Sequence, residues 1–301
     1  DPDLETRLWP HGDRSIYAAY DRIFGCRGHG WSNLQSAHLN LPFAGDEEFG
    51  RLHAAVRLVL PLLPALAAAS PLVNGHLTGL LDNRIEMYRV NQARIPSITG
   101  HVIPEAAFTI DAYQKTILEM LYRDIAPHDP EGILQEEWLN SRGAIARFDR
   151  NAIEIRLLDV QESPLADLAI ITFLVEVLRE LVAETCVPWT EQQLWSETSL
   201  AEIFLAVLQE GRGALVKDPR YLAMFGIRAD CLSVGELWQT LAERLLTRSD
   251  EAWAPLQVIL DEGPLARRII QALGTEPGRD RLTAVYRELC DCLREGRMYH
   301  A

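Results

Sequence analysis

The chain has 301 residues, of which 48% are hydrophobic and 24% are charged. This composition is ordinary for a globular protein and argues against a disordered, collagen-like or disulfide-scaffold chain. The formal net charge is −14, which disfavours a nucleic-acid partner, because phosphate binding needs a surplus of Lys and Arg. The length suits one large domain or two small ones.

The cysteines and the most apolar segment bear on the cellular location of the protein. Five scattered cysteines without a Cys-x-x-Cys pair disfavour a zinc site and a secreted disulfide framework. The apolar run 58–73 contains three prolines and is shorter than the ~20 residues of a membrane span. No signal-peptide pattern opens the chain. We therefore expect a cytoplasmic protein with no membrane partner.

The first part of the chain, residues 1–163, mixes expected strands with helices. A helix is expected from Asp46, as N-cap, to Leu60, and another over 113–125. Strands are expected over 33–41, 144–148 and 152–159. Residues 149–151 read Asp-Arg-Asn, which favours a tight hairpin turn between the last two strands. The sheet is therefore expected to be antiparallel.

Residues 164–301 read almost entirely as helix, with Gly and Pro between the helical runs. We expect this helical portion to pack on the same domain as the α+β portion 1–163. Its helices are predicted over 165–178, 199–211, 233–247, 251–261, 263–273 and 279–295.

Polar side chains alternate with apolar ones along two of the expected strands. Glu154 and Arg156 share one face of strand 152–159, and Ser36, His38 and Asn40 share one face of strand 33–41. A solvated outer face is one interpretation of such a row. A carboxylate, a guanidinium and an imidazole together also suit a divalent cation and a polyphosphate. We favour this second interpretation, although His38 could instead be a buried histidine bonded to backbone.

A family resemblance becomes specific when four blocks are considered in order. They are Gln35-Ser-Ala-His-Leu-Asn40, the stretch Leu62 to Pro71 (LLPALAAASP), Gly75-His-Leu-Thr-Gly79 with Arg84, and the stretch Gly143 to Asp159 with its Glu-Ile-Arg. Together they resemble the bacterial glutamate–cysteine ligase type 2 family, also called carboxylate–amine ligases.

The resemblance implies a glutamine-synthetase-like fold, in which an antiparallel sheet curves into a funnel flanked by helices. It also implies ATP and Mg²⁺ as cofactors and small-molecule substrates. The implied reaction phosphorylates a carboxylate, typically the γ-carboxylate of glutamate. An amine, typically that of cysteine, then displaces the phosphate to form an amide, as in glutathione biosynthesis.

The same resemblance gives roles to the polar residues. Glu154, a hard oxygen ligand, is expected to bind Mg²⁺ with His38. Ser36, His38, Arg147 and Arg156 are expected to contact ATP, and Arg156 and Arg84 to act in catalysis. The amides of Thr78-Gly79 are expected at a helix start that attracts anions. For Arg84, a surface ion pair with Asp82 or Glu86 is the alternative interpretation.

Departures from the family pattern leave other functions open. Family members usually begin with a Glu-rich strand, and nothing before Asn33 resembles it. We therefore expect a fragment of a longer protein that folds, that could form homo-oligomers, and that cannot ligate alone. The alternatives to a glutamate–cysteine ligase are a ligase of the same mechanism with another acid or amine, and a non-catalytic fragment or scaffold protein.

Overall fold

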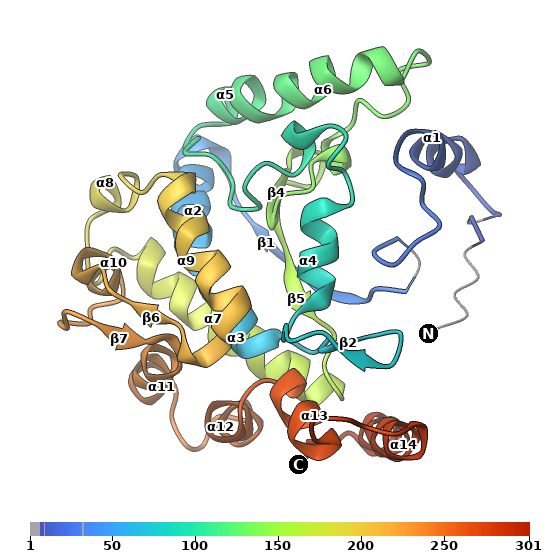
Figure 1. The fold of residues 1–301 in the computed structure, drawn as a ribbon. Coiled ribbons are helices and arrows are strands. Elements are labelled where there is room, and N and C mark those ends of the chain that lie inside the picture. The colour runs from blue at the N-terminus through green and yellow to red at the C-terminus, as the bar shows by residue number, and fades with distance from the viewer. Residues whose placement is uncertain (1–6, 9, 32) are drawn as a thin grey trace.

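A curved three-stranded antiparallel sheet lies at the centre of the fold (Figure 1). This computed structural model describes residues 7–8, 10–31 and 33–301. The strand order is β1-β5-β4, so β5 is the central strand. The strands of this sheet are β1 (Ser36–Pro42), β4 (Ala144–Arg147) and β5 (Ala152–Asp159).

The predicted hairpin between β4 and β5 is confirmed. A 3₁₀ turn, Phe148–Arg150, leads into Asn151, whose φ is 49°. Asn tolerates this left-handed conformation better than most residues. The bounds predicted for β5 agree with the structure, whereas β1 begins at Ser36 rather than at residue 33.

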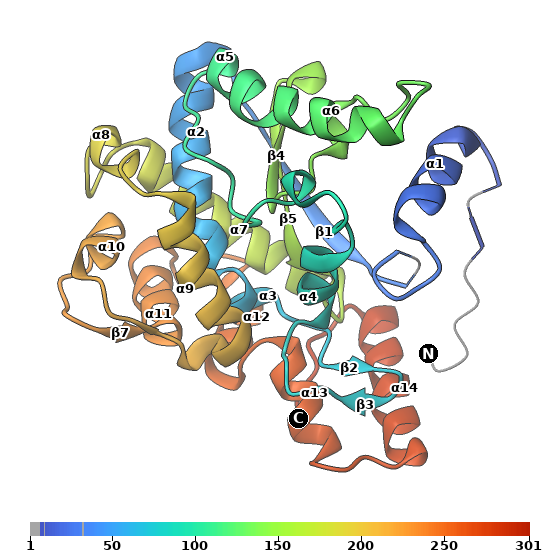
Figure 2. The same ribbon diagram turned by 45° about the horizontal axis from the view of Figure 1, so that its top comes forward.

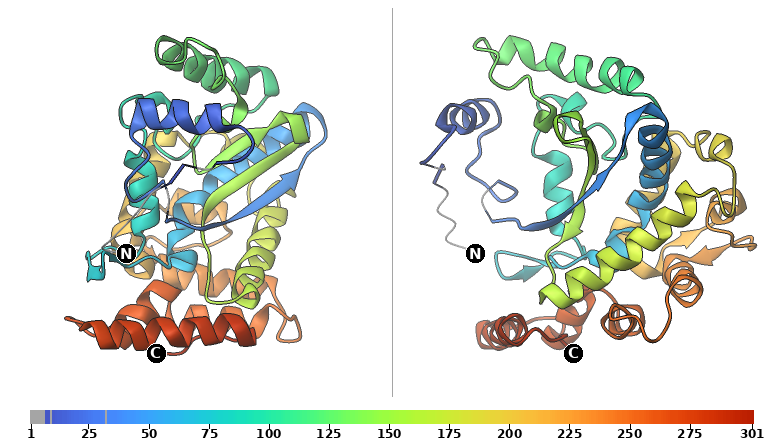
Figure 3. Two further views of the ribbon diagram at one scale, coloured as in Figure 1. Left: turned by 90° about the vertical axis from the view of Figure 1, so that its right-hand side faces the viewer. Right: turned by 180° about the vertical axis from the view of Figure 1, so that it is seen from behind.

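Helices cover the two faces of the sheet in different ways. The helices α2 (Gly45–Val59) and α7 (Pro164–Val182) lie against its apolar face and contact each other. The helices α4 (Asn83–Val90) and α1 (Arg14–Phe24) lie on the opposite side, with α1 further out (Figure 3). The polar face of the sheet therefore turns toward α4 and α1.

The remaining elements form the top and the base of the molecule in Figure 1. Above the sheet, α5 (Ile110–Tyr113) and α6 (Glu119–Ile125) are joined by a π-helical turn, Gln114–Leu118. Beside and below it are α3 (Pro64–Ala67), α8 (Trp189–Gln192), α9 (Glu197–Glu210), α10 (Pro219–Met224), α11 (Val234–Leu245), α12 (Trp253–Glu262), α13 (Leu265–Leu273) and α14 (Arg279–Glu295). Two short strand pairs lie near these helices: β2 (Leu72–Val73) with β3 (His76–Leu77), labelled in Figure 2, and β6 (Leu215–Val216) with β7 (Leu232–Ser233), labelled in Figure 1.

The predicted fold class, α+β with a largely helical second half, is confirmed. One cluster of buried apolar side chains includes residues from both halves of the chain, among them Ile153 and Trp238. The Trp238 indole also donates to the carbonyl of Leu62 at 3.1 Å. The core is thus continuous across residue 163, while the division into 1–163 and 164–301 stays a prediction. No helix within the described residues is apolar and long enough to traverse a bilayer.

Two local predictions are wrong. Asp46 is not the N-cap, because α2 begins at Gly45 after Ala44. The Asp46 carboxylate instead accepts from the Ile110 amide at 2.7 Å and so ties α2 to the start of α5. The helical interpretation of 164–301 also missed the β6–β7 pair, whose two-residue strands are too short for an alternating pattern.

A buried ion pair fixes the last helices to the end of the sheet. Glu162 follows β5 by three residues, and its carboxylate lies 2.5 Å from the Arg268 guanidinium of α13. Both side chains are fully buried. The same carboxylate accepts from the Tyr299 amide at 3.1 Å. The chain after α14 is therefore held to the segment that leaves β5.

We expect Arg268→Met to lower the free energy of unfolding by about 3–5 kcal/mol, because it leaves the Glu162 charge buried with little compensation. Urea denaturation measures the change. The matched control is Arg294→Met on α14, whose pair with Asp291 involves an arginine side chain that is 69% exposed. The free energy of unfolding of the control variant should change by less than about 0.5 kcal/mol. Equal losses of stability in the two variants would contradict the role given to Arg268.

Candidate functional site

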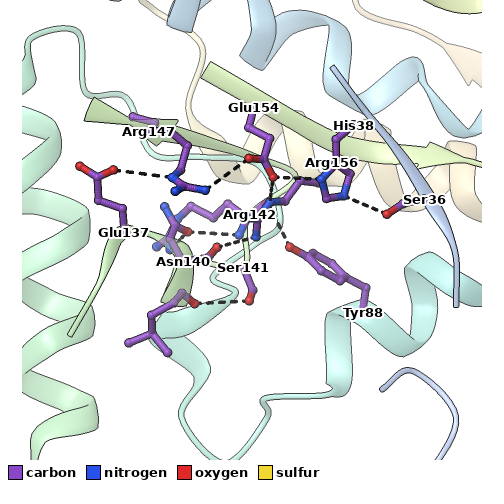
Figure 4. Close-up of polar contacts among 12 residues, drawn as sticks. Ser36, His38, Tyr88, Glu137, Asn140, Ser141, Arg142, Arg147, Glu154 and Arg156 are labelled. Atoms are coloured by element: carbon purple, nitrogen blue, oxygen red, sulfur yellow. Dashed lines mark hydrogen bonds and ion pairs between the residues drawn. The ribbon is translucent and has the colours of Figure 1, made fainter. Parts of the chain in front are cut away.

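Glu154 is the centre of a polar cluster on the face of the sheet that turns toward α4 (Figure 4). Its Oε1 lies 2.7 Å from Arg156 Nε and 3.0 Å from His38 Nδ1. Its Oε2 lies 3.6 Å from Arg147 Nη1. The hydrogen bond from His38, helped by Arg156, lowers the pKa of Glu154 to about 2, although burial opposes the shift. The carboxylate is therefore ionised at neutral pH.

Strand pairing brings these residues together. Glu154 on β5 is opposite Asn40 on β1 and Ile145 on β4. The register between β1 and β5 shifts between Ala37 and Leu39, and it then places Asp159 opposite Ser36. Glu154 and Asp159, five residues apart, consequently lie on the same face as the polar residues of β1. A strict two-residue period would have put Asp159 on the apolar face.

The structure excludes a solvated outer face for the β5 part of the polar row, and the binding of a cation and a polyphosphate stays a prediction. Glu154 and Arg156 do share a face and contact each other. The solvated outer face is excluded there, because Glu154 is only 5% exposed. The alternative for His38 is also wrong: its side chain is 40% exposed, and its ring nitrogens bond to Glu154 and to the Ser36 hydroxyl rather than to backbone.

A buried loop positions the Arg156 guanidinium. Arg156 Nη1 donates to the Asn140 carbonyl at 3.2 Å. The loop itself is fixed by Arg142, whose fully buried guanidinium makes two hydrogen bonds of 2.5 Å to Glu105. Sequence reasoning missed Asn140, Arg142 and Glu105. Their only signal was the position of Asn140 and Arg142 immediately before the Gly143–Asp159 block.

Arg147 faces several carboxylates. It lies 3.1 Å from Asp149 and 3.7 Å from Glu137, in addition to Glu154. Burial raises the pKa of Glu137 to about 7, with Asp149 adding to the shift. Glu137 is thus only partly ionised near neutral pH. An incoming phosphate or carboxylate would compete with Glu154 for Arg156.

Arg84 lies apart from this cluster, at the end of β5. Its buried guanidinium pairs with Asp159 and donates through Nη2 to the Arg156 carbonyl at 3.2 Å. The alternative of a surface pair with Asp82 or Glu86 is therefore wrong. Arg84 and Asp159 line a hollow of about 440 Å³ beside α13 and α14. The contacts of Arg84 support β5, and its catalytic role stays a prediction.

The expected anion site at Thr78-Gly79 is not at a helix start. The helix α4 begins four residues after Gly79, and the Asp82 side chain accepts from the Ile85 amide at 2.8 Å as its N-cap. Burial and the neighbouring Asp159 raise the pKa of Asp82 well above its ordinary value. The first turn of α4 is thus capped by the protein itself.

A larger hollow of about 770 Å³ lies next to the loop whose Asn140 carbonyl accepts from Arg156, although Arg156 itself does not line it. Residues of α1 and the loop before β4 line it, among them Tyr20, Trp138 and Ser141. Ser141 follows Asn140, whose carbonyl accepts from Arg156. Aromatic walls with a few polar groups are typical of small-molecule sites of this size.

The donor set does not fit a resident Mg²⁺ ion. Glu154 is engaged by two arginines and His38, and both ring nitrogens of His38 are engaged. In the part of the chain that the structure describes, no three His, Cys, Asp or Glu residues are grouped to hold a metal. Mg²⁺ prefers several oxygen ligands. Metal binding by Glu154 and His38 stays a prediction, and we assign no step to the ion.

We expect Glu154→Gln to lower the free energy of unfolding by about 2 kcal/mol near neutral pH, because two arginines lose their shared counter-charge. The pKa of this carboxyl is depressed in the folded state. Its contribution is therefore present above the unfolded pKa, near 4.5, and is lost as the pH falls toward 2.

Urea unfolding of both proteins between pH 7 and pH 3 tests this. The difference between wild type and variant should shrink as the pH falls below about 4.5. The control is Glu119→Gln on the exposed face of α6, which should show a small difference at every pH. A Glu154→Gln difference that stays constant down to pH 3 would contradict the ionised cluster.

Comparison with known proteins shows the family of the chain. Residues 1–288 match Glutamate-cysteine ligase family 2 (GCS2). The chain is also 31% identical over 295 residues to an "Uncharacterized protein" of Archaeoglobus fulgidus. That alignment covers 98% of this chain and 73% of the relative. The chain belongs to the glutamate–cysteine ligase family 2.

Proposed function

We propose that this protein is an ATP-dependent carboxylate–amine ligase that forms an amide through an acyl phosphate. The family suggests a ligase of the carboxylate–amine type. The observation that carries the proposal is the Arg156 guanidinium, which Glu154 and the Asn140 carbonyl hold in place. The Arg156 side chain is 14% exposed, so part of it is open to an incoming anion.

Each step of this chemistry develops negative charge near the polar face. A carboxylate oxygen of the acid substrate attacks the γ-phosphorus of ATP, and the bond from that phosphorus to the ADP oxygen breaks. An amine nitrogen then attacks the acyl carbon, the carbon–phosphate oxygen bond breaks, and a proton leaves the nitrogen. Cationic donors that are fixed before the reaction stabilise such charge.

The arginines are the residues to which we give this role. Arg156 binds a phosphate or carboxylate oxygen and is released from Glu154 as it does so. Arg147 and Ser36 are proposed to contact the nucleotide from the same face. Arg84 would act only through the backbone of Arg156, since its side chain is paired with buried Asp159. Mg²⁺ enters the proposal only as the ion that accompanies ATP in solution.

The substrates are proposals of the same kind. Glutamate is the first acid to test and cysteine the first amine, as the family's name indicates. A cytoplasmic location and a homo-oligomer remain predictions, and so does the view that a longer protein is required for turnover. The assay therefore uses both the 301-residue chain and the full gene product.

We expect phosphate release from ATP to require a carboxylate substrate, and hydroxylamine to trap the acyl phosphate as a hydroxamate. Arg156→Ala should lower hydroxamate formation by about 100-fold or more. The matched control is Arg150→Ala in the hairpin, whose side chain is 60% exposed and pairs with Asp149. It should retain the wild-type rate.

Two outcomes would contradict the proposal. ATP hydrolysis that ignores every added acid, without hydroxamate, would favour a plain ATPase. No turnover and no ATP binding by the full gene product would favour a non-catalytic scaffold protein.

A further inference from the structure

The hollow of about 770 Å³ beside α1 has a wall of aromatic side chains. The Tyr20 ring lies 5.6 Å from the Trp31 ring and 6.1 Å from the Trp138 ring, measured between ring centroids. Phe24, which is outside the lining, stacks on Trp31 at 6.0 Å with 20° between the ring planes. Tyr20, Trp31 and Trp138 line the hollow and are half-buried. Part of this packed aromatic surface is therefore open to a ligand.

Two buried polar side chains line the same hollow. Gln92 is 5% exposed and Ser141 is 7% exposed. Both are held to one short segment of the chain. Thr99 Oγ1 donates to Gln92 Oε1 at 3.2 Å, and the Ser141 amide donates to the carbonyl of Ile98 at 2.9 Å. This shared anchor keeps the amide of Gln92 and the hydroxyl of Ser141 next to each other.

Each of these side chains has hydrogen-bonding capacity that the protein does not use. Gln92 Nε2 has no hydrogen-bond partner among the described residues, whereas the oxygen of the same amide has one. The Ser141 hydroxyl donates to the Leu139 carbonyl at 3.4 Å, so the lone pairs of its oxygen remain able to accept (Figure 4). An amide nitrogen in so enclosed a residue needs a partner. The hollow thus offers a ligand one donor beside one acceptor.

The aromatic wall and the polar pair together define a ligand chemistry. Aromatic side chains favour a planar aromatic ring, because such rings pack offset or edge to face. A neighbouring donor and acceptor suit a ring edge on which an acceptor lies beside an N–H, as in nitrogen heteroaromatic rings. Gln92 and Ser141 are uncharged, and the charged residues of the lining include the opposite charges of Arg7 and Asp13. The ring that suits this hollow is therefore neutral.

The hollow is separate from the residues to which we gave contacts with ATP. Ser36, His38, Arg147 and Arg156 all lie outside its lining. Its connection to them is the loop before β4, where the carbonyl of Asn140, the residue before Ser141, accepts from Arg156. A ligand in the hollow would thus lie next to the proposed ligase site without occupying it.

We propose that this hollow binds the neutral nitrogen heteroaromatic ring of a small molecule other than ATP. The ring packs against Tyr20, Trp31 and Trp138. Its acceptor takes a hydrogen bond from Gln92 Nε2, and its N–H donates to Ser141 Oγ. The inference does not rest on the proposed ligase, because it uses none of the residues given to that reaction.

A titration followed by saturation-transfer NMR tests the proposal on the 301-residue chain, without ATP or Mg²⁺. The probe is quinazolin-4-one, a neutral fused ring whose N–H lies next to its carbonyl oxygen. We expect it to bind with a Kd of about 1 mM or lower. Its N-methyl derivative, methylated on the nitrogen next to the carbonyl, keeps the ring but lacks the donor and should bind about tenfold more weakly. Saturating ATP should leave the Kd of the probe unchanged.

Variants locate the probe in the hollow. Gln92→Leu removes the donor and Trp138→Leu removes an aromatic face, so each should raise the Kd about tenfold. The matched controls are Gln257→Leu and Trp253→Leu, whose side chains line a different hollow beside α12. Both controls should keep the wild-type Kd. Circular dichroism shows whether each variant is folded, and the comparison of the two compounds on wild-type protein needs no variant.

Any of four results would overturn the inference. The first is the absence of probe binding to folded wild-type protein, and the second is an equal Kd for the probe and its N-methyl derivative. The third is an unchanged Kd in folded Gln92→Leu and Trp138→Leu. The fourth is displacement of the probe by ATP, which would assign the hollow to the nucleotide. The ligase is measured separately by ATP-dependent hydroxamate formation, so the failure of one proposal is distinguished from the failure of the other.

Discussion

The position of β5 between β1 and β4 is the constraint on which the rest of the site depends. Antiparallel pairing on both sides fixes the register of Glu154 against Asn40 and Ile145. One buried carboxylate is thereby placed among an imidazole from β1, a guanidinium from β4 and a guanidinium from its own strand. The hydrogen bond from His38 and the charge of Arg156 hold the pKa of Glu154 low against the effect of burial.

The alternation of polar and apolar side chains along a strand was the most informative pattern in the sequence. It predicted β5 with its observed bounds and placed Glu154 and Arg156 on one face. Apolar residues that recur over three turns or more predicted α14 with its observed bounds, whereas α7 runs four residues beyond its predicted end. Local periodicity carries this information because one face of each element is buried by whatever packs on it.

The partners of each side chain could not be predicted in the same way. Arg84 was expected to act in catalysis, with a surface pair to Asp82 or Glu86 as the alternative, yet it pairs with Asp159, 75 residues later. Arg142 depends on Glu105 through a loop whose path no local pattern describes. Asp159 changes face through a register shift between β1 and β5. These features arise from tertiary contacts, which a two-residue or 3.6-residue period in the sequence cannot predict.

The hydrogen bond from the Tyr299 amide to Glu162 has a consequence for the dynamics of the protein. Glu162 follows directly on the segment that leaves the central strand, and it accepts from the Tyr299 amide and from Arg268. The helices α13 and α14 thus cannot detach without exposing a buried charge beside the sheet. Fraying of this end of the molecule is thereby coupled to opening of the sheet. The Tyr299 amide, although close to the last residue, should exchange its hydrogen as slowly as amides of β5.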